Sequence, residues 1–168
     1  MSTDAPLEVM CEFSEVIREL APHFEVGSRD YPNFTQPRII IWEFDGLPHY
    51  WCEGFGSSKP VISLPPSKVK PEKKVIAHEL GHWYHHSINP KGYYASLSLG
   101  GLGKELEGAV REGIAFYSEI CLGLGKGILD NPEFSLGKFS RMNPKQLVGE
   151  RERLIRFYKE DILPMVIY

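Results

Sequence analysis

The sequence of 168 residues has few cysteines, and no two of them are spaced as C-x-x-C. Cys11, Cys52 and Cys121 are odd in number and widely separated, which argues against a disulfide framework. We therefore expect three reduced, buried thiols. Internal repeats and low-complexity tracts are also absent, and the length is typical of one domain. We predict that residues 1–168 form a single domain with its own core.

Long apolar segments are absent as well, because no run approaches the roughly 18 residues that indicate a membrane-spanning helix. The segment Met1 to Phe13 contains Asp4, Glu8 and Glu12 and lacks the layout of a secretory signal. Neither sign of charge is in large excess, since the net charge is −3. This balance argues against nucleic acid or an anionic membrane as a partner. We expect a cytoplasmic protein, and the sequence leaves its oligomeric state open.

The residue patterns of the N-terminal half predict one helix followed by short strands. Leu7–Leu20 has the periodicity of a helix, and Arg38–Phe44 is typical of a strand buried on both faces. The turn signal Asp45-Gly46 predicts that His49–Phe55 pairs back as a hairpin partner. Prolines on both sides of Val61–Leu64 favour an edge strand there.

The C-terminal half is predicted to be helical. Helices are expected at Lys73–His86, Lys104–Leu122 and Pro144–Leu163, and a glycine-rich loop at Ser87–Gly103 separates the first two. Together with the short strands, these helices predict an α+β fold.

The helix expected at Lys73–His86 contains His78-Glu79-Leu80-Gly81-His82, a complete H-E-x-x-H. A spacing of four places both histidines on one helix face, one turn apart, so that they can bind the same metal ion. Glu79 lies beside them, where it can hold a water molecule at the metal and accept its proton. Ile76, Leu80 and Trp83 form an apolar stripe next to this face. We therefore expect the helix to be buried on one side and to direct its histidines into a cleft.

A catalytic zinc ion takes three protein ligands and keeps one position for water. His86 follows His78 by eight residues, a rise of about 12 Å along the helix, whereas zinc–nitrogen bonds are about 2.0–2.1 Å. We therefore expect His85 and His86 to be solvated or to line the rim of the cleft. No histidine follows His86. The third ligand is then His23, His49 or a carboxylate of the next helix.

That next helix offers four carboxylates, Glu105, Glu107, Glu112 and Glu119. Glu112 has small neighbours that would let the two helices approach closely: Gly108, Ala109, Gly113 and Ala115. Glu119 lies two turns further along the same face, where it either hydrogen-bonds a ligand histidine or forms a surface ion pair. Glu105 and Glu107 are expected in solvent at the helix start.

Glu112-Gly113-Ile114-Ala115-Phe116-Tyr117-Ser118-Glu119 resembles the E-G-x-A-x-Y-x-E segment that supplies the third zinc ligand in aminopeptidase-N-like gluzincins. His78 to His82 is similar to the first ligand pair of the same clan. The resemblance implies a gluzincin-type zinc metallopeptidase of minigluzincin size, with Zn²⁺ bound by His78, His82 and Glu112 and with Glu79 as the catalytic base. It also implies a zincin-like fold, in which a small twisted sheet with an edge strand over the cleft packs against two ligand helices.

The resemblance covers about Val61 to Leu122, and the chain differs from the gluzincin pattern in three respects. Glu112 follows His82 by 30 positions, a longer gap than usual. No acid stands four residues after Glu112, where thermolysin-like members keep an orienting aspartate. The G-x-M-E-N-type motif of aminopeptidases is absent, which argues against aminopeptidase specificity.

These residues predict a zinc-dependent endopeptidase that acts on a peptide or protein. Its substrate would pair with the edge strand expected at Val61–Leu64. Tyr93, Tyr94, His85 and His86 are candidates for stabilising the oxyanion, whereas Tyr117 is expected to be structural.

Two alternative functions remain open. The first is a regulator-cleaving metallopeptidase resembling the IrrE family, whose members also place a Glu-x-x-Ala helix after H-E-x-x-H and cut a transcriptional repressor. The second is a non-catalytic zinc-binding interaction module on the same scaffold. Glu79 argues against this second alternative, because a purely structural site has no need for it.

Overall fold

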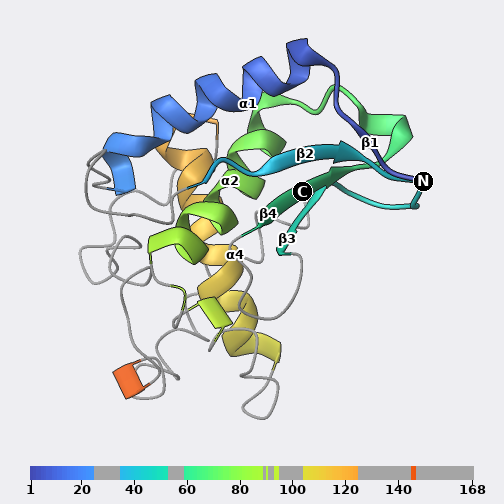
Figure 1. The fold of residues 1–168 in the computed structure, drawn as a ribbon. Helices are drawn as coiled ribbons and strands as arrows, with labels where there is room; N and C mark the ends of the chain where they lie inside the picture. The colour runs from blue at the N-terminus through green and yellow to red at the C-terminus, as the bar shows by residue number, and fades with distance from the viewer. Residues whose placement is uncertain are drawn as a thin grey trace.

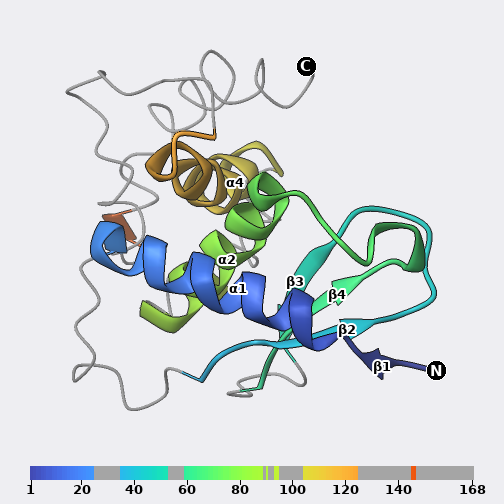
Figure 2. The same cartoon turned by 90° about the horizontal axis from the view of Figure 1, so that it is seen from above.

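The computed structural model describes residues 1–24, 35–52, 59–88, 90, 93–94, 104–124 and 145–146. In these residues the chain forms a four-stranded mixed sheet and three long helices, α1 (Leu7–Leu20), α2 (Lys73–Ile88) and α4 (Lys104–Cys121) (Figure 1). Figure 2 shows α2 lying between α1 and α4. The predicted α+β class is confirmed. The helix predicted at Pro144–Leu163 and the loop predicted at Ser87–Gly103 lie for the most part outside the described residues.

Helix α1 spans Leu7–Leu20, as predicted. It buries one face, and the buried side chains recur at helical spacing: Val9, Phe13, Val16, Ile17 and Leu20. A short 3₁₀ helix, Ala21–Phe24, continues from its end. Tyr84 of α2 donates a hydrogen bond to the carbonyl of Ile17 at 2.5 Å, and its ring stacks on Phe24 with centroids 4.6 Å apart. These contacts fix α1 against α2.

The sheet has the strand order β1-β2-β4-β3. Its strands are β1 (Thr3–Asp4), β2 (Arg38–Ile41), β3 (His49–Cys52) and β4 (Pro60–Leu64). Strands β2 and β4 are parallel, whereas β1 pairs with β2 and β3 pairs with β4 in the antiparallel direction.

Two strand predictions are therefore wrong. The strand at Val61–Leu64 is not at an edge, because β4 lies between β2 and β3, and all five of its residues are buried. Pro60 begins β4 and Pro65 follows its end, so neither proline interrupts the hydrogen bonds of the ladder. The strand at His49 pairs with β4 and not with β2, and it forms the edge of the described sheet.

The strand predicted at Arg38–Phe44 is shorter than expected. Strand β2 ends at Ile41, and the next two residues, Trp42 and Glu43, are exposed. Ile39 and Ile40 are buried, whereas Arg38 is exposed and pairs with Asp4 at 2.8 Å. Burial on both faces thus holds for β4 at the centre of the sheet and not for the whole of β2.

Helix α2 spans Lys73–Ile88 and carries the H-E-x-x-H motif. Its predicted apolar stripe is confirmed, because Ile76, Leu80 and Trp83 are all buried. Burial of Ile76 and Leu80 contributes roughly 1.5–3 kcal/mol each to the docking of the helix. Every residue from Glu79 to His86 is buried, so α2 is central to the fold and not merely buried on one side.

The crossing of α2 over α4 (Lys104–Cys121) requires a glycine at position 81. A methyl group on Gly81 would lie 2.8 Å from the Cα of Ala115 and 3.2 Å from the carbonyl oxygen of Ile114, and it would clash with the Ser118 hydroxyl. Real side chains do not approach a neighbouring backbone this closely. The absence of a side chain at Gly81 therefore sets the distance between the two helices.

Two further expectations concern the burial of the cysteines and the absence of a membrane-spanning helix. All three thiols are free, but Cys11 is exposed and Cys52 and Cys121 are only half-buried, so the expectation of buried thiols is wrong for Cys11. Among the described helices, none combines the length and apolar character needed to cross a membrane.

Gly81→Ala is expected to destabilise the protein by about 1–3 kcal/mol, because the added methyl overpacks the α2–α4 contact. It should also weaken metal binding, since Glu112 would move away from the two histidines. Thermal unfolding and a zinc titration measure the two effects. Ser118→Ala in the same chain should restore only part of the stability, because the contact with Ala115 is to the backbone. A Gly81→Ala variant with unchanged stability would contradict this account.

Candidate metal centre

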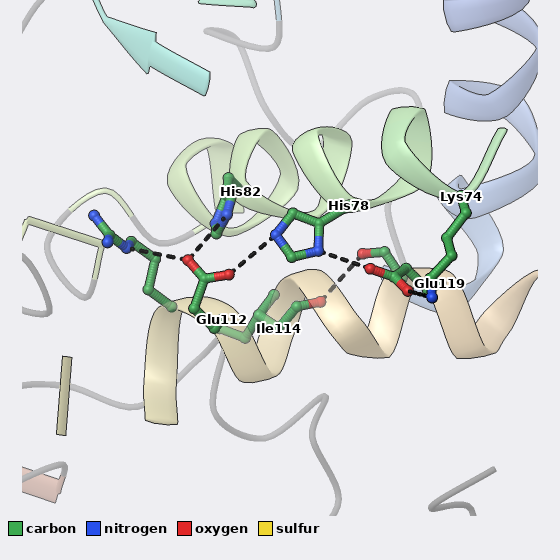
Figure 3. Close-up of polar contacts among 8 residues, drawn as sticks. Lys74, His78, His82, Glu112, Ile114 and Glu119 are labelled. Carbon is green, nitrogen blue, oxygen red and sulfur yellow. Dashed lines mark hydrogen bonds and ion pairs between the residues drawn. The ribbon is translucent and has the colours of Figure 1, made fainter. Parts of the chain in front are cut away.

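Three side chains from two helices converge at one point of the structure. Figure 3 shows His78 and His82 projecting from α2 toward α4, and Glu112 reaching back toward both. The Nε2 atom of His78 lies 3.0 Å from Oε2 of Glu112, and that of His82 lies 3.6 Å from Oε1. One ligand atom from each of the three residues lies within 4.8 Å of the others. Tetrahedral zinc ligands at about 2.0–2.1 Å would be about 3.3 Å apart, which falls between the two measured distances.

The environment of His82 tests whether a metal ion fits. Its ring is buried, and Nδ1 has no hydrogen-bond partner among the described residues. The separation of 3.6 Å from Glu112 is too long for a hydrogen bond at Nε2. Burial lowers the pKa of His82 to about 3, so the ring stays neutral and keeps a lone pair. A cation bound at Nε2 would compensate for burying this polar ring. The residues present therefore fit a metal ion.

The other nitrogen of His78 is held by a second carboxylate. Oε1 of Glu119 lies 2.7 Å from Nδ1 of His78, and Oε2 lies 3.5 Å from the ammonium group of Lys74 (Figure 3). Glu119 is only 3% exposed. Of the two interpretations of Glu119, the structure supports the hydrogen bond to His78, a candidate ligand, and the accompanying ion pair with Lys74 involves a buried carboxylate. Such a bond fixes the ring orientation and the position of its proton.

The charges of His78 and Glu112 are coupled. Burial lowers the pKa of His78, but hydrogen bonds to Glu112 and Glu119 outweigh burial and raise its pKa to about 10. Burial raises the pKa of Glu112, but the hydrogen bond from His78 and the charges of His82, His78 and Arg111 together outweigh burial and lower the pKa to about 2. At neutral pH the pair is thus an imidazolium beside a carboxylate, and a metal ion would have to displace one proton to bind both groups.

Glu79 lies in the same cleft and is only 6% exposed. Burial raises its pKa to about 7, against the lowering effects of the positive charge on His78 and of a hydrogen bond from the backbone N–H of Tyr50. A carboxylate with a pKa near neutrality can both accept and return a proton. This is the behaviour expected of a general base and acid.

The cleft around these residues has a volume of about 540 Å³ and is bounded by β3, α2 and α4. Besides the three candidate ligands and Glu79, its lining includes Tyr50, Tyr93, Arg111 and Phe116. The sequence patterns did not identify Arg111 as a residue of the site. Its position directly before Glu112 was the one available signal, but arginine on a helix usually points to solvent.

The other residues that the sequence suggested for the site lie in different places. His49 lines the cleft but does not belong to the ligand cluster. His85 is not solvated and does not line the cleft, because it is fully buried; His86 is also buried and is hydrogen-bonded to Tyr50. The expectation for both residues was therefore wrong. The side chains of Glu105, Glu107 and Tyr117 lie outside the described part of the chain.

The donor set of two imidazole nitrogens and one carboxylate suits zinc and leaves room for a further ligand. No protein-family model matches the chain, and no match was found among curated proteins or solved structures. The residues and distances above are thus the basis for assigning chemistry to the site.

Zinc binding near pH 7 should release about one proton, because the raised pKa of His78 keeps that ring protonated until the metal arrives. The apparent affinity should consequently rise about tenfold per pH unit between about pH 7 and pH 9, below the pKa of His78. Calorimetry in buffers of different ionisation enthalpy measures the proton release.

Two variants test which residue is the third ligand of the zinc ion. Glu112→Gln should abolish tight zinc binding, whereas His49→Asn should leave it unchanged. If His49→Asn weakens binding more than Glu112→Gln does, His49 rather than Glu112 is the third ligand.

Glu119→Gln should weaken zinc binding by about 10- to 100-fold, because His78 loses the charged partner that orients its ring and makes it more basic. Lys74→Met is the matched control. This change removes the second partner of Glu119. The Lys74–Glu119 contact is longer, at 3.5 Å, and the Lys74 side chain is half-exposed, so its loss should change the zinc affinity by less than about threefold. Equal affinities for wild type and Glu119→Gln would exclude an orienting role for Glu119.

Proposed function

We propose that this protein is a zinc-dependent endopeptidase with a zincin-like arrangement of its ligand helices. One observation carries the proposal: His78, His82 and Glu112 converge at the wall of a cleft that also contains a buried Glu79. The H-E-x-x-H and E-G-x-A-x-Y-x-E patterns, which resemble those of gluzincins, support the same function.

His78, His82 and Glu112 would hold the ion through the three atoms that already lie close together. When bound, Zn²⁺ would polarise the scissile carbonyl and make a water molecule more acidic. Glu79 would take the proton from the attacking water and deliver it to the leaving amine. Its pKa of about 7 suits both transfers.

The substrate would lie along β3. This strand contributes His49 and Tyr50 to the cleft, and no other described strand pairs with its outer edge. An extended peptide could therefore add to the sheet there through main-chain hydrogen bonds. Antiparallel β3 takes the role that the sequence had given to Val61–Leu64.

Two side chains of the cleft are suited to stabilising negative charge on the scissile carbonyl oxygen. Burial raises the pKa of the Tyr93 hydroxyl, so it stays protonated and can donate a hydrogen bond. Arg111 lines the same cleft and brings a permanent positive charge. Among the residues first considered for this role, Tyr93 is supported, whereas His85 is fully buried and does not line the cleft.

The position of Glu79 also favours an enzyme over a zinc-binding interaction module. Burying a carboxylate costs free energy unless it is paired, and the pKa of about 7 reflects that cost. A site that only holds a structural ion gains nothing from such a residue. A proton-transferring site requires it.

Glu79→Gln should retain zinc with unchanged stoichiometry and lose at least about a thousandfold in kcat on a random peptide library, because amide cannot accept the proton. Metal analysis and mass spectrometry of the cleaved peptides measure the two properties. Glu15→Gln makes the same chemical change on the exposed face of α1 and should leave both unchanged. A wild-type protein that binds zinc but cuts no peptide or unfolded protein would contradict the proposal and favour the interaction module.

A further inference from the structure

A buried polar cluster lies next to the cleft, and the hydrogen bonds within it have no role in the mechanism described above. It consists of Tyr50 and Cys52 of β3 and His86 of α2. The hydroxyl of Tyr50 lies 2.6 Å from Nδ1 of His86, and the thiol of Cys52 lies 3.3 Å from each of those two atoms. Tyr50 and His86 are each 8% exposed. This cluster joins the edge strand to the motif helix.

The direction of the hydrogen bonds follows from protonation. Burial raises the pKa of Tyr50, mainly by desolvating the phenolate, so the hydroxyl keeps its proton. Burial lowers the pKa of His86, so the ring is neutral. Tyr50 therefore donates to Nδ1 of His86, and the ring carries its own proton on Nε2. The thiol of Cys52 is left to donate to the Tyr50 oxygen.

The place of His86 on α2 connects this bond to the metal centre. His86 follows His82 by four residues and His78 by eight, so the three rings descend one face of the helix in successive turns. The first two rings face Glu112, whereas the third holds Tyr50. Tyr50 and Glu79 line the same cleft, where the backbone of Tyr50 lowers the pKa of Glu79. Strand β3 is thus held to α2 through the Tyr50–His86 hydrogen bond, at a place where Tyr50 also lies beside Glu79 in the cleft wall.

We infer that Tyr50 and His86 are positioning residues, whose hydrogen bond holds the edge strand β3 against the motif helix and thereby orients Glu79 for proton transfer. This inference rests on the proposed peptidase function. The bond fixes the side chain of Tyr50, and Tyr50 in turn forms the cleft wall beside Glu79. Without it, Glu79 can rotate within the cleft, and misplacement of a catalytic group by about 1 Å can lower a rate by up to about a hundredfold.

The test uses the full chain with Cys11→Ser and Cys121→Ala, so that Cys52 is the remaining thiol. Tyr50→Phe removes one oxygen and keeps the ring, which also packs on Tyr93 with centroids 6.0 Å apart. His86→Leu removes the acceptor. His86→Asn is the matched rescue variant, since its side-chain oxygen can take the place of Nδ1.

Three measurements separate positioning from folding and from metal binding. Zinc affinity should stay within about threefold of the parent in all variants, because neither residue is among the candidate ligands. In Tyr50→Phe and His86→Leu, kcat should fall about tenfold while KM changes by less than about threefold. The rate at which a thiol reagent modifies Cys52 should rise about tenfold in the same two variants, because the strand is no longer held. His86→Asn should restore both rates to within about threefold of the parent.

The outcomes distinguish the two proposals. If the parent chain cleaves peptides and Tyr50→Phe leaves both kcat and the Cys52 rate unchanged, the positioning role is wrong and the peptidase stands. If kcat falls equally in His86→Leu and His86→Asn, the acceptor at position 86 is not what matters and the inference also fails. If the parent chain cleaves nothing, the proposed function fails and the positioning role fails with it, whatever the thiol rates are.

Discussion

The close approach of α2 and α4 at Gly81 is the constraint on which the candidate site depends. A carboxylate on α4 can reach two imidazoles on α2 only if the helices nearly touch, and the backbone of Ala115 occupies the space that any side chain at position 81 would need. The glycine at the fourth position of the H-E-x-x-H motif is therefore as important as the candidate ligands themselves. Helix packing and the spacing of the candidate ligands depend on the same glycine, because the distance between α2 and α4 determines both.

The charges at the centre are arranged for binding rather than for stability. His78 lies between two carboxylates in a largely dehydrated position, and His82 lacks any hydrogen-bond partner at Nδ1 in the described part of the chain. Buried charged groups recover their desolvation free energy only when they are fully paired, so such a cluster is a weak source of stability. A divalent cation would balance the carboxylate charge and engage the neutral ring. The raised pKa of His78 is the sign that the site already attracts a positive charge.

Helix α2 also organises the wall of the cleft. Its histidines at positions 78, 82 and 86 follow one face, while His85 is directed to the interior and is fully buried. The first two turns provide the candidate metal ligands and the third holds Tyr50 of the edge strand. In the proposed function, this single helix would position a bound ion, the general base and the surface on which an extended peptide would lie. Displacing α2 would disturb all three together.

Local patterns determined the parts of this protein that depend on spacing along one element. The bounds of α1, the apolar stripe through Leu80 and the pairing of His78 with His82 all follow from 3.6 residues per turn, and Glu112 was identified from a pattern within one helix. The sequence could not determine which strands are neighbours, because prolines flank edge and central strands alike. Only the tertiary structure placed β4 at the centre of the sheet, buried His85 and His86, and tied Tyr50 to α2, since each of these depends on segments far apart in the chain.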